Sequence, residues 1–118
     1  MADRLLAFDT ASLYFRAFFG LPSTLRVADG RPVNAVRGLL DFLARFITDY
    51  SPTQVACGWD NNWRPTWRVD LVPSYKRHRV VELDGAEQES VDDDLSVQVP
   101  LIRECLPAVG LPVIGAPQ

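Results

Sequence analysis

Cysteine and histidine are scarce in this chain of 118 residues, which contains two cysteines and one histidine. Cys57 and Cys105 are isolated, without a CxxC pair and without a histidine at the spacing of a metal site. This pattern argues against a disulfide scaffold and against a zinc site. We therefore expect a reduced, cytoplasmic protein.

Long apolar runs and targeting signals are also missing. No stretch approaches the roughly 20 apolar residues that a membrane span needs, and no basic segment followed by an apolar segment precedes a cleavage site. No GxGxxG or GxxxxGK[ST] loop follows the first apolar run, so nucleotide binding is the weakest functional reading. We expect no membrane partner and a cytoplasmic location.

Charge is modest overall but uneven along the chain. At 118 residues and 47% hydrophobic composition, the sequence suits a single domain or part of one, with a net charge of -3. Residues 61–79 carry several basic side chains against one acid, whereas residues 80–94 carry seven acids and no base. The basic members are Arg64, Arg68, Lys76, Arg77 and Arg79. Such a basic segment, interleaved with aromatic residues, favours contact with a nucleic-acid backbone.

Hydrophobic periodicity predicts an α/β fold with a mostly parallel sheet and flanking helices. Strands are expected at 5–8, 55–59 and 111–114. Helices are expected at 12–21, where the aromatic residues would lie in the core, and at 34–50. A third helix is expected at 95–109, where Pro100 and Pro107 would shorten or bend it and Gly110 would end it. The turn at 27–32 uses Gly30, and the acidic stretch around Asp84 and Gly85 is expected to be a solvated loop.

Two aspartates stand directly after predicted strands. Asp9 follows the apolar run 5–8, and Asp60 follows the run 55–59. Because ligands of open α/β sheets bind outside the carboxyl ends of the strands, both carboxylates would lie at one edge, where they could hold Mg²⁺ or Mn²⁺. Asp9 could equally be the N-cap of the helix that follows it. The run Asp92 to Asp94 is interpreted as acids at a helix N-terminus rather than as metal ligands.

The ordered motifs resemble a known family. They are Leu6-Ala7-Phe8-Asp9, Tyr14-Phe15-Arg16, Gly30-Arg31-Pro32, Gly58-Trp59-Asp60, Trp67-Arg68, Tyr75-Lys76, His78-Arg79, Asp93-Asp94-Leu95 and Gly110-Leu111-Pro112. Together they resemble the 5′ nuclease domain of bacterial DNA polymerase I and its free-standing relatives, the 5′-3′ exonuclease and flap endonuclease group. The resemblance implies a PIN-like, Rossmann-like fold with an arch at about residues 61–94. It covers only the N-terminal part of such a domain, since the later acidic motif and the helix-hairpin-helix have no counterpart.

The resemblance also implies roles for individual residues. Asp9 and Asp60 match the first two metal-binding aspartates, which would hold Mg²⁺ or Mn²⁺, with two ions in a complete domain. The expected substrate is DNA with a 5′ end, branch or flap, RNA is left open, and no obligate protein partner is inferred. The resemblance places Arg68, Lys76 and Arg79 in the arch, where they would grip the substrate strand and stabilise charge on the scissile phosphate.

Two further positions match the family with a choice of roles. Arg16 occupies a basic position of the first helix that could approach the phosphate, although a surface ion pair is the alternative. Tyr75 could stack on a base or pack at the root of the arch.

Two other functional readings stay open at the level of sequence. A small PIN-domain ribonuclease of the toxin type shares the opening strand and Asp, and it would need a helix acid such as Asp41. A non-catalytic nucleic-acid-binding module would keep the basic segment without a working metal site.

Overall fold

The computed structural model describes residues 3–60, 70–74, 80–83, 86–89 and 93–115. Its main sheet has three parallel strands in the order β1-β2-β5, namely β1 (Leu5–Asp9), β2 (Gln54–Trp59) and β5 (Val113–Gly115). The register pairs Phe8 with Cys57, and Cys57 with Val113. The predicted α/β class, the three strands and their parallel arrangement are therefore confirmed.

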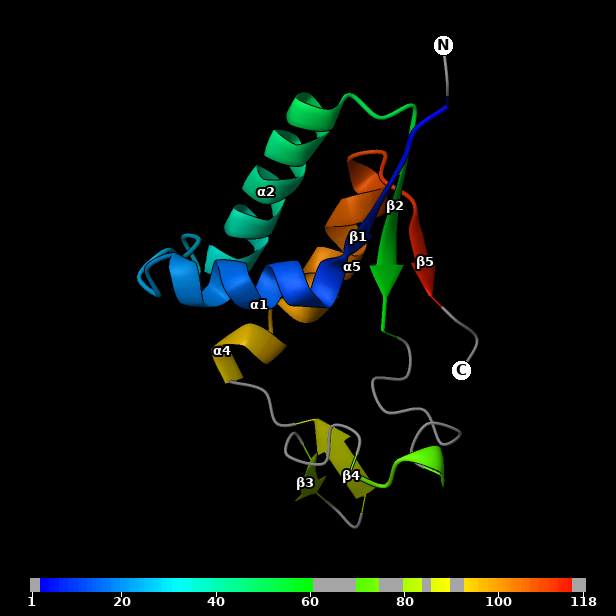
Figure 1. Ribbon diagram of the computed structural model, residues 1–118. Helices are drawn as coiled ribbons and strands as arrows, with labels where there is room; N and C mark the ends of the chain where they lie inside the picture. The colour runs from blue at the N-terminus through cyan, green and yellow to red at the C-terminus, as the bar shows by residue number, and fades with distance from the viewer. Residues whose placement is uncertain (1–2, 61–69, 75–79, 84–85, 90–92, 116–118) are drawn as a thin grey trace.

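Helices connect the strands on one side of this sheet (Figure 1). The β1–β2 connection contains α1 (Thr10–Gly20) and α2 (Asn34–Tyr50), and the β2–β5 connection contains α4 (Asp93–Ser96) and α5 (Val99–Ala108). Side chains that alternate along a strand point to opposite faces of the sheet. Phe8 and Cys57 are buried against the helices, whereas Leu5 and Ile114 on the other face are 64% and 59% exposed. None of the helices in the described ranges combines the length and apolar character of a membrane span.

The helix α2 matches its predicted bounds. Its apolar stripe buries Val36, Leu39 and Leu43 in the core, as the three- and four-residue spacing requires. Ser51 ends the helix in the left-handed conformation at φ 45°. The core continues through Leu95, Ile102 and Leu106, which are at most 1% exposed.

The segment predicted as a helix at 95–109, shortened or bent by Pro100 and Pro107, forms two helices, α4 and α5, with the break just before Pro100. Pro100 has no N–H to donate to the Ser96 carbonyl, so a continuous helix loses a bond there. The C-terminal stop is confirmed, because Gly110 has φ 88° and Leu111 N–H donates to the Leu106 carbonyl at 2.9 Å. Val109, expected in the core, is 59% exposed.

Two further expectations are corrected. Phe19, one of the aromatic residues expected in the core, is 76% exposed at the end of α1. The stretch expected as a solvated loop contains an antiparallel hairpin of β3 (Val80–Leu83) and β4 (Ala86–Glu89), in which Leu83 pairs with Ala86. An Asp-Gly dipeptide between two short extended segments is a strong hairpin signal, and it was present in the sequence at 84–85.

A buried polar pair ties the helices together. Gln98 Oε1 accepts hydrogen bonds from the Ala35 and Val36 N–H groups at 2.8 and 3.2 Å, and so caps the N-terminus of α2. Gln98 Nε2 donates to Asn34 Oδ1 at 2.8 Å, and Asn34 Nδ2 donates to the Phe18 carbonyl at 2.9 Å. The end of α1, the start of α2 and the α4–α5 junction are thereby held as one unit.

Candidate metal and nucleic-acid site

Asp9 ends β1 and also caps the helix that follows. Its Oδ1 accepts a hydrogen bond from Ser12 N–H at 3.3 Å, which fixes the carboxylate at the N-terminus of α1. The residue is exposed, and no described residue donates to Oδ2. Capping therefore occupies one carboxylate oxygen and leaves the other for a ligand.

Asp60 lies at the same end of the sheet. Asp9 pairs with Gly58, and Asp60 follows two residues later, directly after the last residue of β2. If the backbone continues from Trp59 to Asp60 in the direction of β2, the spacing between neighbouring strands and the rise of two residues put the Asp9 and Asp60 Cα atoms about 8 Å apart. Both side chains are exposed, so both carboxylates reach solvent at this edge.

Trp59 anchors the backbone immediately before Asp60. Its ring lies 6.2 Å from the ring of Tyr14 on α1, and the Arg103 guanidinium of α5 lies 5.8 Å from its centroid. A cation over a Trp ring contributes about 0.5–1 kcal/mol at an exposed site. The end of β2 is thus held between two helices, and no local pattern in the sequence pointed to Arg103.

Comparison with known proteins identifies the family. The sequence profile described as "5'-3' exonuclease, N-terminal resolvase-like domain" matches residues 4–118. The chain belongs to the 5′-3′ exonuclease family. It is 53% identical over 109 residues to a 5'-3' exonuclease of Streptomyces coelicolor and 49% identical over 120 residues to one of Mycobacterium tuberculosis.

These relatives are longer than this exonuclease-family chain. The matched regions cover 91% and 99% of the chain, but 36% and 38% of the two exonucleases. A DNA polymerase I of Mycobacterium bovis is 32% identical over 114 residues, which is 96% of the chain and 12% of the polymerase. The chain therefore spans about a third of the length of the exonucleases it matches.

The two carboxylates at this edge of the sheet are ligands of the type that a hard divalent cation prefers. Asp9 and Asp60 offer carboxylate oxygens, which Mg²⁺ and Mn²⁺ prefer over nitrogen or sulfur. Within the described ranges, no group of three or more His, Cys, Asp or Glu side chains is close enough to hold a metal ion. Among the described residues, Asp9 and Asp60 therefore offer only part of the ligand set that a divalent cation usually takes.

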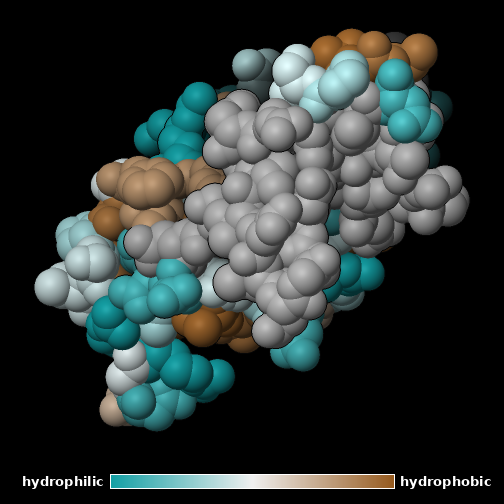
Figure 2. Space-filling model, turned by 90° about the horizontal axis from the view of Figure 1, so that it is seen from below, coloured by the Kyte–Doolittle hydropathy of each residue, from teal (hydrophilic) through white to brown (hydrophobic). Residues whose placement is uncertain are grey.

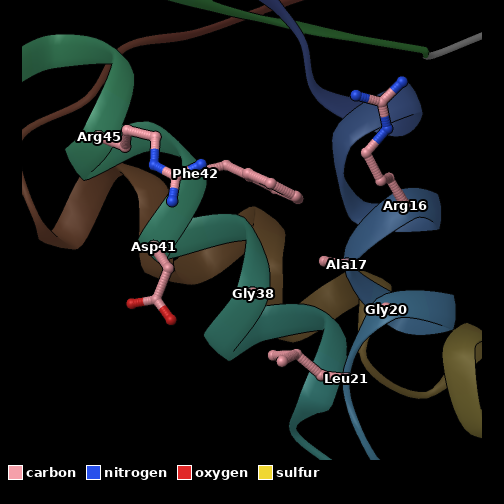
Figure 3. Close-up of a pocket in the computed structure, with 8 residues that line it drawn as sticks. All are labelled: Arg16, Ala17, Gly20, Leu21, Gly38, Asp41, Phe42 and Arg45. Atoms are coloured by element: carbon pink, nitrogen blue, oxygen red, sulfur yellow. The ribbon is translucent and has the colours of Figure 1, made fainter. Parts of the chain in front are cut away.

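Arg16 lies on α1, and its side chain is exposed. It lines a cavity of about 180 Å³ between α1 and α2, together with Gly38, Phe42 and Arg45 (Figure 3). The surface ion pair considered for Arg16 is not formed with any described carboxylate. Asp41, which also lines the cavity, instead pairs with Arg37 at 3.6 Å.

The position of Asp41 also tests the alternative of a small PIN-domain ribonuclease of the toxin type. Such an enzyme would need its helix acid beside the acid at the strand end, but Asp9 and Asp41 line two different cavities. Because the chain belongs to the 5′-3′ exonuclease family, we do not pursue the toxin-type ribonuclease alternative further.

The remaining predicted contacts to nucleic acid lie outside the described residues. They are Arg64, Arg68, Tyr75, Lys76, Arg77 and Arg79. Figure 2 views the molecule from the end at which β2 points, where hydrophilic side chains alternate with separate hydrophobic patches around the grey segments.

A buried thiol and hydroxyl lie beneath the aspartate edge. Cys57 and Thr10 are 0% and 1% exposed. Burial raises the pKa of the Cys57 thiol, and a weak interaction with the Thr10 side chain partly opposes this. Thr10 Oγ1 has no hydrogen-bond partner of good geometry among the described groups. Because the thiol is enclosed and protonated, it is a packing group.

Proposed function

We propose that this chain provides the metal-binding edge and the basic arm of a 5′ nuclease that hydrolyses phosphodiester bonds at 5′ ends or flaps of DNA. The observation that carries the proposal is the parallel register, which brings Asp9 and Asp60 to one end of the sheet. Membership of the 5′-3′ exonuclease family supports the same chemistry.

Asp9 and Asp60 would hold Mg²⁺ or Mn²⁺, with two ions in a complete domain. A bound divalent cation supplies Lewis-acid polarisation of a phosphoryl oxygen and charge stabilisation. The chain's own contribution is positional. Ser12 N–H fixes the Asp9 carboxylate, and the Tyr14 and Arg103 contacts to Trp59 fix the backbone that presents Asp60.

The basic segment would hold the substrate strand against that edge. Arg68 and Arg79 would fork onto phosphate oxygens, since guanidinium binds them in a bidentate manner. Lys76 would place a point charge near the scissile phosphate, where negative charge develops. Arg64, Arg77 and Arg16 would add backbone contacts, and Tyr75 would stack on a base.

The metal assignment is tested first by binding. Asp9→Asn and Asp60→Asn should each weaken Mn²⁺ binding, measured by electron paramagnetic resonance. Asn is also a good N-cap, so Asp9→Asn removes the charge while the helix cap is retained. Asp49→Asn, an exposed acid on α2, is the matched control and should bind Mn²⁺ as the unchanged chain does. Unchanged binding in both site variants would remove the assignment.

Cleavage of a 5′-labelled flap DNA in Mg²⁺ or Mn²⁺ is the second readout. Any metal-dependent cleavage should be lost in Asp9→Asn and Asp60→Asn and kept in Asp49→Asn. For DNA binding, Arg68→Ala and Arg79→Ala should each lower the slope of log affinity against log salt by about one unit. Arg37→Ala, which removes an exposed arginine already paired with Asp41, should leave that slope unchanged.

A further inference from the structure

The cavity between α1 and α2 has an apolar floor. The floor lies where the two helices approach closely, because a Cβ built on Gly38 would lie 2.6 Å from the Ala17 Cβ and 3.1 Å from Leu21 Cδ1. None of these three side chains can form a hydrogen bond. The floor of the cavity therefore suits an apolar group that leaves water.

The size of the cavity limits what it can hold. Its volume is about 180 Å³. Pockets that enclose drug-sized ligands measure about 300–1,000 Å³. The cavity therefore suits one apolar side chain, of the size of leucine or phenylalanine, rather than a larger molecule enclosed as a whole.

Two arginines of the cavity lining have no charged partner in the part of the chain that the structure describes. Arg37 of α2 pairs with Asp41 at 3.6 Å, whereas Arg16 and Arg45 form no ion pair and no side-chain hydrogen bond with any described residue. Both side chains are exposed. In Figure 3 the Phe42 ring extends from α2 towards α1 between the two arginines. A ligand that brings carboxylates to this rim would give each guanidinium a partner.

We propose that this cavity docks an acidic peptide segment of a partner protein, with one apolar side chain on the floor and carboxylates on Arg16 and Arg45. Guanidinium binds a carboxylate through two parallel N–H···O bonds, which orient the peptide on the rim. Exposed ion pairs alone contribute little affinity. The buried apolar side chain therefore supplies most of the binding, and the arginines select an acidic sequence around it.

The rim favours a peptide over a nucleic-acid strand. Asp41 lines the same cavity, and its carboxylate would repel the phosphates of a strand that crossed both arginines. A peptide backbone instead offers N–H groups, from which a carboxylate accepts hydrogen bonds. The mixed charge of the rim thus matches a peptide whose acidic side chains reach the arginines while its backbone passes Asp41.

Nuclear magnetic resonance titration of the isotope-labelled chain tests the docking directly. The probe is a blocked pentapeptide with one phenylalanine between two pairs of glutamates. It should bind saturably, with a dissociation constant of about 1 mM or lower, and shift the amides of Gly20, Gly38 and Phe42. Two control peptides carry glutamines in place of the glutamates or alanine in place of phenylalanine, and both should bind more weakly. Absence of a saturable shift at these amides, or equal binding of all three peptides, overturns the proposal.

Arg45→Gln tests the charged rim. Arg45 is chosen because the proposed function already gives Arg16 a contact with the DNA backbone. The variant should weaken binding of the glutamate peptide about threefold or more, because one ion pair is lost. Arg4→Gln removes an exposed arginine that does not line the cavity, and this matched control should bind as the unchanged chain does. Equal weakening by both variants would be a general effect of net charge and would contradict the proposal.

Gly20→Leu tests the apolar part of the cavity. Gly20 lines the cavity, and a Cβ built on it would meet nothing within 4 Å, so the larger side chain has room beside the space that the peptide needs. The variant should bind the peptide about tenfold or more weakly, with an unchanged circular dichroism spectrum. Undiminished affinity in the folded variant would refute docking in the cavity. If the variant does not fold, Arg45→Gln decides.

A nucleic-acid strand and a second copy of the chain are the competing occupants. A thymidine pentanucleotide should give no saturable shift at the three amides, and dilution of the chain alone should leave their positions unchanged. Saturable binding of the nucleotide at these amides would assign the cavity to nucleic acid. Shifts that grow with the concentration of the chain alone would assign it to self-association. Either result overturns the proposal.

Discussion

Replacement of Gln98 by leucine should be among the most destabilising single changes in this chain. Gln98 is 1% exposed, and its side chain makes four hydrogen bonds, two to the N–H groups of Ala35 and Val36, one to Asn34 and one to the Asp94 carbonyl at 3.0 Å. Leucine has a similar volume, so the change leaves little cavity but removes every bond. At about 1 kcal/mol net for each bond, the free energy of unfolding should fall by about 4 kcal/mol.

Urea denaturation followed by circular dichroism measures this loss. The midpoint should fall while the m-value stays constant, because the folded and unfolded surfaces change little. Gln54→Leu, at an exposed position of β2, is the matched control and should stay within about 0.5 kcal/mol. A loss below about 1 kcal/mol in Gln98→Leu would show that water or a rearranged side chain caps α2 equally well, and would refute the reasoning.

Other predictions concern glycine packing and the buried thiol. A Cβ at Gly38 would lie 2.6 Å from the Ala17 Cβ, so Gly38→Ala should cost about 1–3 kcal/mol in urea unfolding, while Gly20→Ala, with nothing within 4 Å, should cost nothing. Cys57 should react with a thiol reagent far more slowly than Cys105 in the folded chain, and equal rates before unfolding would contradict its burial. Because burial raises the pKa of Cys57, the stability it contributes is complete below the ordinary thiol pKa of about 8.5 and declines as the pH rises above it. Cys57→Ala should lessen that decline in unfolding curves measured on both sides of this pH.

Some features of this protein could be predicted from sequence because their causes lie within a few residues. The apolar spacing of α2, the left-handed glycine after α5 and the aspartate that ends β1 and caps α1 are local patterns. The hairpin of β3 and β4 also has a local signal, the Asp-Gly dipeptide at 84–85, and the prediction of a solvated loop there is wrong. The family was also readable from the order and spacing of its short motifs.

The candidate site could be predicted only in part. Asp9 and Asp60 stand after strands in the sequence, but their common edge depends on parallel pairing across 49 or more positions, as in the bond from Arg4 N–H to Thr53. The cation over Trp59 comes from Arg103, on a helix that no pattern near Trp59 identifies. Strand pairing and the Arg103–Trp59 contact depend on how distant segments pack together. The periodicity of the sequence around one residue therefore does not predict which distant residue contacts it.

The α/β class, the bounds of α2 and the placement of both aspartates at strand ends follow from the amino-acid sequence, because hydrophobic periodicity and turn chemistry act locally. Packing between distant segments, by contrast, determines that Gln98 caps a helix 63 positions away, that Phe19 and Val109 lie at the surface, and that no strand in the described ranges pairs with the outer edge of β1. The physical reason is that burial and hydrogen-bond partners depend on how the helices and strands pack together. The position of a residue in the periodic pattern predicts which other residues lie on the same face of its helix or strand. It does not predict whether another helix or strand covers that face.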